Sequence, residues 1–500
     1  MLTVEEIKQF ILEDRTSKKK RMAREGLRYF EGENDIKQYR VFYYNKDGKL
    51  IEDKRSAGGR AASGFFPENV QQKTQFTLSA EGKLIRSDIP ELQEQLDLRF
   101  DDEFDSEVSD VLDYGSAEGF SYFYRYADKD LISKFKFAEG LHVIEVESKY
   151  ASDNQDHIIY YYLEKVKTIG KGTEYITKIQ DWDKQFTYFY IEENNDIKID
   201  KSVELNPRPH IIYNQNGKKY FETFGSIPFY RYSNNKREIS DLKPIKEYID
   251  SYDIINYGLF DNILSLSEGY FCVKGFQGDD LDELITTLKT KHHIGVPEEG
   301  DLAVHTVDIP YEARKTKMDL DKENIYQFGM SFNPTQVGDG NVTNVVIKSR
   351  YGLLDIKCSH CAKMLKKTLK QMVSDVLDEI NQANNTEYTL KDVWFNLDDR
   401  EVITNELDNA QIEQLKAQTE QLKINTLLNI QTLFDNETLM QNICEILDID
   451  YELIKGKLPK PEEEESLNNA EKILNKQIEG DTTVKKDEKP EDKLDKAPAE

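Results

Sequence analysis

The residues best suited to chemistry are two cysteines three positions apart, in the segment Cys358-Ser359-His360-Cys361. A CxxC pair can cycle between thiols and a disulfide, or it can supply half of a zinc site. This pair lies inside a helical pattern, and the other cysteines, Cys272 and Cys444, stand alone. We therefore interpret both side chains as small residues packed within a helix. A metal or redox enzyme built on Cys358 and Cys361 remains an alternative.

Other enzyme signatures are missing from the sequence. No P-loop, nucleophile elbow, HExxH or EF-hand pattern occurs. The glycine clusters Gly58-Gly59-Arg60 and Gly338-Asp339-Gly340 lack a preceding strand and a following helix, which favours turns over phosphate cradles. Carboxylates are too numerous to single out a catalytic pair. The motifs favour a protein that is not an enzyme and has no cofactor and no metal.

The charge is strongly negative, with 94 acidic residues against 67 basic residues. This balance argues against a surface that simply grips nucleic acid, because such surfaces are basic. Residues 341–373 differ, since they contain one acidic residue, Asp355, and seven basic ones: Lys348, Arg350, Lys357, Lys363, Lys366, Lys367 and Lys370. This patch either balances acidic surface elsewhere or faces phosphate.

The sequence also gives expectations about location. It has no run of about 18 apolar residues, so we expect no transmembrane helix. The first six residues lack the basic and apolar layout of a signal peptide. Four cysteines are too few for a disulfide scaffold, which indicates synthesis in a reducing cytosol.

The elements that must position these residues begin with a helix over the first 30 residues, where Thr3 and Glu6 form a capping-box pattern. The basic run from Lys18 to Arg21 is interpreted as a solvated helix face. Residues 40–80 are expected to be strands, residues 86–113 one acidic amphipathic helix, and residues 118–232 a strand-rich region.

The second half is expected to be mainly helical. It begins with a long helix from Ser240 to Gly269, followed by an α/β insert from Tyr270 to Asp308 that contains a helix near 279–291. A helix from about Tyr311 to Phe328 then leads to a loop over 329–341 and to a helix from Thr343 to about Asn381, with a kink expected near Gly352. Helices over 403–457 and a disordered charged tail from Pro459 complete the chain.

Several motifs in this order resemble the portal proteins of tailed bacteriophages, in the branch found in phages of Gram-positive hosts. The motifs are Tyr29–Ile36, Ile227-Pro228-Phe229 with Asn234-Asn235, Ser240-Asp241-Leu242, and Ile249-Asp250-Ser251-Tyr252-Asp253. Asp253 departs from the family pattern, in which Tyr-Asn is commoner. The tail after residue 459 has no pattern to match.

The resemblance implies an α+β portal-protein fold that assembles into a ring, normally of twelve identical subunits. The implied parts are an N-terminal helical segment (1–28), a wing (29–238), a stem helix (239–268), a clip (269–308), a second stem helix (309–329), a tunnel loop (330–341), a long kinked helix returning to the wing (342–400), a helical crown (401–457) and a disordered charged tail (458–500).

The resemblance also implies a role in the virion. The ring would occupy one capsid vertex after assembly in the host bacterial cytoplasm, and double-stranded DNA would pass through it during packaging and ejection. Implied partners are further copies of the chain, the terminase large subunit, a head–tail connector or adaptor, and the major capsid and scaffolding proteins, with no membrane. The rival hypothesis is a non-enzymatic helical interaction scaffold, built on 403–457, without a DNA channel.

Two sets of residues are the candidate DNA-channel positions. The tunnel loop supplies Ser331, Phe332, Asn333, Pro334, Thr335, Gln336, Val337, Gly338, Asp339 and Gly340. The basic residues expected to reach the lumen are Arg314, Lys315, Lys317, Lys322, Lys348 and Arg350.

Overall fold

The structure is a computed structural model, and it divides into two compact units, residues 1–403 and 404–500, which are described separately. The residues that it describes are 2–44, 47–52, 59–147, 155–168, 172–193, 196–215, 218–266, 270–274, 301–305, 310–333, 344–398, 406–430, 436–447 and 451. The expected helix near 279–291, loop positions 334–341 and the tail lie outside these residues.

The chain opens with two helices, α1 (Val4–Thr16) and α2 (Lys18–Phe30). The capping box is confirmed, because the Thr3 hydroxyl accepts a hydrogen bond from the Glu6 amide at 3.2 Å. The solvated basic face is wrong for Lys20, which is only 4% exposed. Its ammonium donates to the backbone carbonyls of Gly140, Leu141 and Val143. The side chain therefore binds the interior of the first unit and does not face water.

The all-strand expectation for residues 40–80 is correct only at its start. Strands β1 (Phe42–Tyr44) and β2 (Leu50–Glu52) form a hairpin, but Phe65–Thr77 is helix α3. Phe66, Val70 and Thr77 are buried at helical spacing on this helix, and that tertiary burial outweighs the local β-propensity.

The acidic segment is two helices, α4 (Pro90–Asp97) and α5 (Asp102–Glu118), and not one. The break occurs because Asp101 acts as an N-cap, with its carboxylate accepting from the Phe104 amide at 3.1 Å. Leu92, Leu96 and Phe104 are buried as the spacing predicts.

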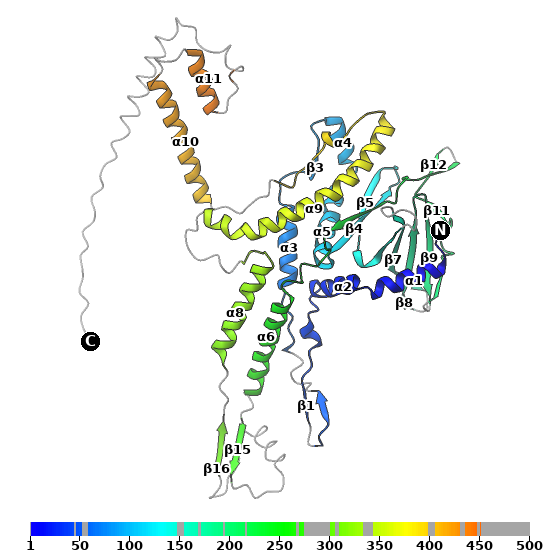
Figure 1. The fold of residues 1–500 in the computed structure, drawn as a ribbon, viewed down its shortest axis with the longest axis vertical. Coiled ribbons are helices and arrows are strands. Elements are labelled where there is room, and N and C mark those ends of the chain that lie inside the picture. Colours follow the sequence, from blue (N-terminus) through cyan, green and yellow to red (C-terminus); the bar gives the residue numbers. More distant parts are fainter. Residues whose placement is uncertain are drawn as a thin grey trace, which may run out of the picture. The chain divides into compact units, whose positions relative to one another are not determined.

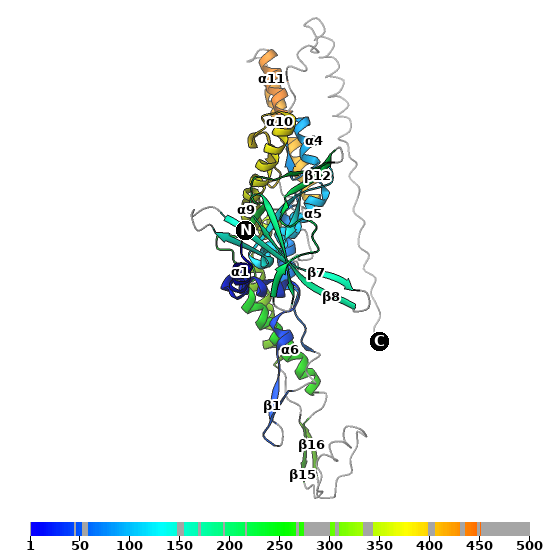
Figure 2. The same ribbon diagram turned by 90° about the vertical axis from the view of Figure 1, so that its right-hand side faces the viewer.

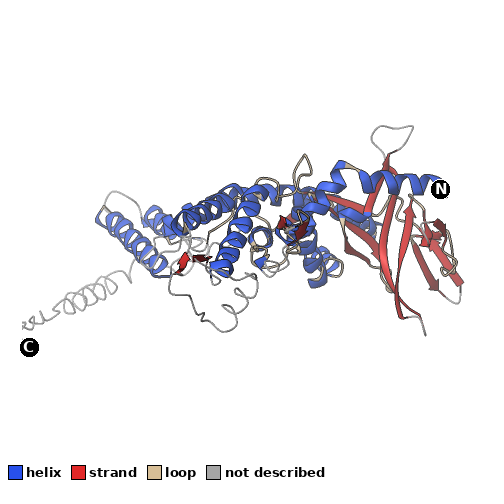
Figure 3. Cartoon of the chain, turned by 90° about the horizontal axis from the view of Figure 1, so that it is seen from below, coloured by secondary structure: helices blue, strands red, loops and turns tan. Residues whose placement is uncertain are grey.

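The strand-rich region forms two antiparallel sheets (Figures 1 and 2). The larger sheet has the order β10-β9-β8-β7-β6, with β11 also paired to β9: β6 (Val143–Glu147), β7 (Gln155–Thr168), β8 (Gly172–Trp182), β9 (Phe186–Glu193), β10 (Asp196–Ile199) and β11 (Arg208–Pro209). The smaller sheet has the order β14-β4-β5: β4 (Phe120–Ala127), β5 (Ser133–Ala138) and β14 (Phe229–Ser233). Figure 3 shows these strands gathered near the N-terminus, with helices lying along them.

Smaller elements complete the first unit. They are the 3-10 helices Asp35–Gln38, Gly140–His142 and Leu390–Asp392, the hairpin of β12 (Ile211–Gln215) and β13 (Lys218–Glu222), and the pairing of β3 (Ile85–Arg86) with β17 (Trp394–Phe395). The two sheets share one core cluster, in which Tyr122 of β4 lies with Ile158 of β7, and the larger sheet has a second cluster with α1. Ile7 and Ile11 of α1 pack with Ile159 and Tyr190 of the larger sheet.

After β14 the chain forms a pair of contacting helices, α6 (Lys246–Leu266) and α8 (Tyr311–Phe328). Helix α6 begins later than Ser240, and the intervening residues form turns. The antiparallel strands β15 (Tyr270–Lys274) and β16 (Asp301–His305) lie between these helices in sequence.

The longest helix is α9 (Asn344–Asn384), which continues through Gly352. Its buried residues Leu365, Leu369 and Val373 belong to the main core, together with Leu112 of α5 and Phe123 of β4. In the second unit, α10 (Glu406–Asn429) and α11 (Asn436–Ile446) contact each other. Within the described part of the chain, none of the helices combines the length and the apolar character that a bilayer crossing requires.

Candidate functional site

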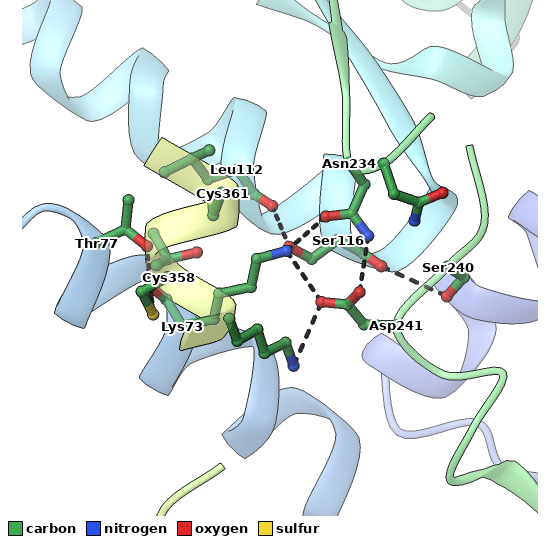
Figure 4. Close-up of polar contacts among 12 residues, drawn as sticks. Lys73, Thr77, Leu112, Ser116, Asn234, Ser240, Asp241, Cys358 and Cys361 are labelled. Atoms are coloured by element: carbon green, nitrogen blue, oxygen red, sulfur yellow. Dashed lines mark hydrogen bonds and ion pairs between the residues drawn. The ribbon is translucent and has the colours of Figure 1, made fainter. Parts of the chain in front are cut away.

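A buried polar cluster joins four separate parts of the first unit (Figure 4). Lys73 of α3 is 2% exposed, and its ammonium donates to Ser116 Oγ of α5 at 2.9 Å and to Asn234 Oδ1. It also forms an ion pair with Asp241 Oδ2 at 2.9 Å. All three donors of this ammonium therefore have acceptors, which a buried charge requires.

Asp241 binds a second cation from α9. Lys357 Nζ lies 3.4 Å from the same carboxylate oxygen and donates to the Gly329 carbonyl at 2.8 Å. Asn234 Nδ2 donates to the other carboxylate oxygen at 2.7 Å. The junction cluster, defined as Lys73, Ser116, Asn234, Asp241 and Lys357, thus links α3, α5, the turn before α6, and α9 to the end of α8.

The electrostatics follow from one carboxylate between two ammonium groups. Burial alone would raise the pKa of Asp241, but the charges of Lys357 and Lys73 hold that pKa far below its usual value. Burial alone would lower the pKa of Lys73, but the charge of Asp241 outweighs burial and raises that pKa. At Lys357 burial outweighs the attraction of Asp241, so the pKa of Lys357 is lowered. Asp241 is therefore ionised at neutral pH, and the cluster serves as a structural lock.

The end of α8 is held close to this lock. A Cβ added at Gly329 would lie 2.6 Å from the Ile325 carbonyl oxygen, so a larger residue would clash there. Glycine therefore fits at the position whose carbonyl accepts the hydrogen bond from Lys357. The next residue, Met330, has φ +51°, a left-handed conformation that costs a non-glycine residue on the order of 1 kcal/mol. The chain turns sharply here and enters the expected tunnel loop.

The first expected loop residues are anchored. Ser331 and Asn333 are buried, and the Gln72 side chain makes two hydrogen bonds with the backbone of Phe332, at 2.9 and 3.0 Å. The Phe332 ring stacks on Tyr351 of α9 with centroids 4.4 Å apart. The base of the loop is therefore fixed between α3 and α9, while the positions from Pro334 to Gly340 lie outside the described residues.

Four of the six candidate lumen cations have described side chains, and all four belong to α8. Lys317 pairs with Asp321 and donates to Ser251 Oγ at 2.9 Å, so part of its charge is balanced within the helix pair. Lys315 is exposed, and Arg314 and Lys322 are half-buried on α8. Lys348 and Arg350 lie on α9, and their side chains are outside the described set.

Cys358 and Cys361 are both buried in α9, which confirms the packed interpretation. Cys358 Sγ donates to the Lys73 carbonyl at 3.4 Å, and Cys361 Sγ lies 3.3 Å from the Tyr232 hydroxyl. Burial raises the pKa of Cys358 to about 11. Among the described residues, no group of three or more His, Cys, Asp and Glu side chains could hold a metal ion.

A second polar contact involves the residue that departs from the family pattern. Asp253 of α6 is 1% exposed, and its carboxylate accepts from Asn34 Nδ2 at 2.8 Å and from the Ser63 amide at 3.0 Å. One side chain of α6 thereby fixes both ends of residues 35–62, which include the β1–β2 hairpin.

Lys73 and Gln72 were missed by the sequence reasoning, which treated their segment as strand. Lys73 was the more recognisable residue, since it continues the buried helical spacing of Phe66 and Val70. A lysine on the buried face of a helix indicates a buried partner, because lysine is almost never fully buried without one.

Comparisons with known proteins identify a class of structural, non-enzymatic phage proteins. The chain belongs to the family described as "Phage portal protein, SPP1 Gp6-like", whose sequence model matches residues 9–455. This confirms the resemblance that the motifs of this chain predict, and the mixed helix and sheet architecture agrees with the expected α+β class.

Two curated relatives carry the name "Portal protein". The protein of Bacillus phage SPP1 is 25% identical over 348 residues, covering 69% of this chain and 67% of the relative. The protein of Clostridium phage phiCD119 is 23% identical over 364 residues, covering 70% and 77%. Among solved structures, a chain of the "Virion of native gene transfer agent (GTA) particle" matches 76% of this chain and 91% of its own length, with 11% identity and a TM-score of 0.40.

Proposed function

We propose that this chain forms a ring, normally of twelve copies, at one vertex of a phage capsid, and that double-stranded DNA passes through it. The observation that carries the proposal is the family match over residues 9–455. The antiparallel contact of α6 and α8 supports it, because it supplies a two-helix stem whose end leads directly to the expected tunnel loop.

In this proposal the parts have the bounds expected from the sequence. The wing is residues 29–238 and the stem helices are 239–268 and 309–329, with the clip at 269–308 between them. Residues 330–341 form the tunnel loop, 342–400 the long helix and its return to the wing, and 401–457 the crown. The described helix ends, Leu266 and Phe328, are compatible with these limits.

An acidic channel suits DNA that must slide. Each phosphate that a protein neutralises adds salt-dependent affinity, so a tightly basic lumen would hold the duplex in place. The net charge of −27 per chain favours repulsion from the wall. A few cations would centre the DNA, and we assign this role to Arg314, Lys315, Lys317, Lys322, Lys348 and Arg350.

The tunnel loop is proposed to follow the moving DNA. Its glycines, Gly338 and Gly340, permit backbone conformations that other residues rarely adopt. The anchored base, in which Gln72 binds Phe332, would transmit force from the loop to α3 and α9.

Packaging needs ATP, and the sequence has no P-loop, so a separate motor must supply the energy. We propose that the terminase large subunit docks on the clip and that a head–tail connector later replaces it. Major capsid and scaffolding proteins would surround the ring in the virion, after assembly in the host cytoplasm.

Negative-stain imaging of the purified full-length chain tests the ring. Rings with an axial hole are expected, whereas monomers or filaments would instead support a helical scaffold without a DNA channel. A deletion of residues 335–340, which spares the anchored Phe332, tests the loop. The ring should persist while DNA packaging falls, and normal packaging by this variant would refute the loop's role.

A further inference from the structure

The segment 35–62, called here the stem arm, is attached at both ends to helix α6. Asp253 binds Asn34 and Ser63, the residues that flank the arm. The Tyr39 and Tyr257 rings also meet edge to face, with centroids 5.4 Å apart. The arm is therefore a built projection with a fixed root, and Figures 1 and 2 show its hairpin extending away from the two sheets.

The tip of the arm is apolar, and among the described residues its large side chains stay exposed. Phe42 is 52% exposed, Tyr44 74% and Leu50 57%, all on the two paired strands β1 and β2. An isolated two-stranded hairpin is at best marginally stable in water and needs a further strand or a packed surface. Large apolar side chains gathered on such a tip mark a contact site.

The helix pair of the same chain also carries exposed apolar side chains. Ile254 of α6 is 46% exposed, and Leu320 and Tyr311 of α8 are 49% and 51% exposed. The net charges of the two surfaces are opposite in sign. The arm carries seven basic and four acidic residues, whereas α6 and α8 together carry five basic and eight acidic residues.

We propose that the hairpin of each stem arm docks on the α6–α8 pair of a second copy of this chain. The arm would link neighbouring copies by placing Phe42, Tyr44 and Leu50 against the exposed apolar residues of the adjacent helix pair. The inference rests on the proposed ring, because only a repeating assembly places one copy's helix pair beside another copy's arm.

Photo-crosslinking in the full-length chain tests this contact. Tyr44 is replaced by benzoylphenylalanine, and unlabelled and ¹⁵N-labelled copies are mixed before assembly and irradiation. We expect adducts that join a light and a heavy copy, with the second peptide lying in α6 or α8. The same probe at Leu12 of α1, which is 64% exposed, is the matched control and should give no such adducts.

A second variant measures the energetic role of the tip. Tyr44→Ser with Leu50→Ser should retain the circular dichroism of the wild-type chain but lose ring assembly, because it removes the docking side chains and no core residue. Unchanged assembly together with the absence of light–heavy adducts to α6 or α8 would overturn the proposal.

The outcomes separate this inference from the proposed function. Rings whose Tyr44 adducts all fall within single copies, or on added connector or capsid protein, refute the arm contact and leave the ring intact. Single copies on electron micrographs, with no light–heavy adducts, refute both.

Discussion

Replacing Asp241 by asparagine is the sharpest test of the junction cluster. The change keeps the shape of the side chain but removes the carboxylate that pairs with Lys73 and Lys357, at 2.9 and 3.4 Å. Two buried ammonium groups are then left without a counter-charge. Breaking a buried ion pair in this way costs on the order of 3–5 kcal/mol.

The magnitude can be converted into a melting shift. The entropy of unfolding is about 2 cal/mol/K per residue. If the first unit of 403 residues melts cooperatively, its total entropy of unfolding is about 0.8 kcal/mol/K. A loss of 3–5 kcal/mol then lowers Tm by about 4–6 °C. Calorimetry of full-length Asp241→Asn beside wild type measures this shift at pH 7.

Lys357→Met is the matched control, since it leaves Lys73 and Asp241 paired. It should therefore lower the free energy of unfolding by less than Asp241→Asn does. In the double variant only one ammonium remains unpaired, so the two effects should add to less than their sum. A Tm shift under about 1 °C for Asp241→Asn, or strict additivity in the double variant, would refute the reasoning.

Acid titration adds a second readout of Asp241. Its pKa is lowered in the folded state, so its contribution to stability is complete above the unfolded pKa and is lost as pH falls towards the folded pKa. The wild-type advantage over Asp241→Asn should therefore be full at pH 7 and shrink below about pH 4. An advantage that is constant with pH would contradict an ionised Asp241.

Three further predictions concern single contacts. Asp253→Ala removes both hydrogen bonds at the root of the stem arm, so trypsin should cut within 35–62 about 10- to 100-fold faster; an unchanged rate on gels would show that Asp253 does not hold the arm. Phe332→Ala removes the ring stacked on Tyr351, and hydrogen exchange should rise at residues 331–333 but not in the α9 core around Leu369; equal protection would show that the stack is not an anchor. Cys358 should resist iodoacetamide at pH 8 until the chain unfolds, because burial raises its pKa to about 11; rapid labelling in the native chain, measured by mass spectrometry, would contradict this.

Local patterns predicted the elements whose sequence and tertiary environment agree. The Thr3–Glu6 capping box, the strands after Gly119 and the buried spacing of Leu92 and Leu96 are all present. The pattern failed for α3 because Phe65–Thr77 is rich in residues that also suit strands. Only packing against α5 and α9 decides that segment in favour of a helix.

The candidate site divides in the same way. The sequence by itself determined the family and the motif residues Asn234 and Asp241, because a motif is a local string of side chains. Only the tertiary structure decided that Lys73 and Lys357, 284 positions apart in the sequence, share the Asp241 carboxylate. A buried charge needs a nearby counter-charge, but that need does not specify which distant residue supplies it. The folded backbone makes that choice by bringing α3, the turn before α6, and α9 together.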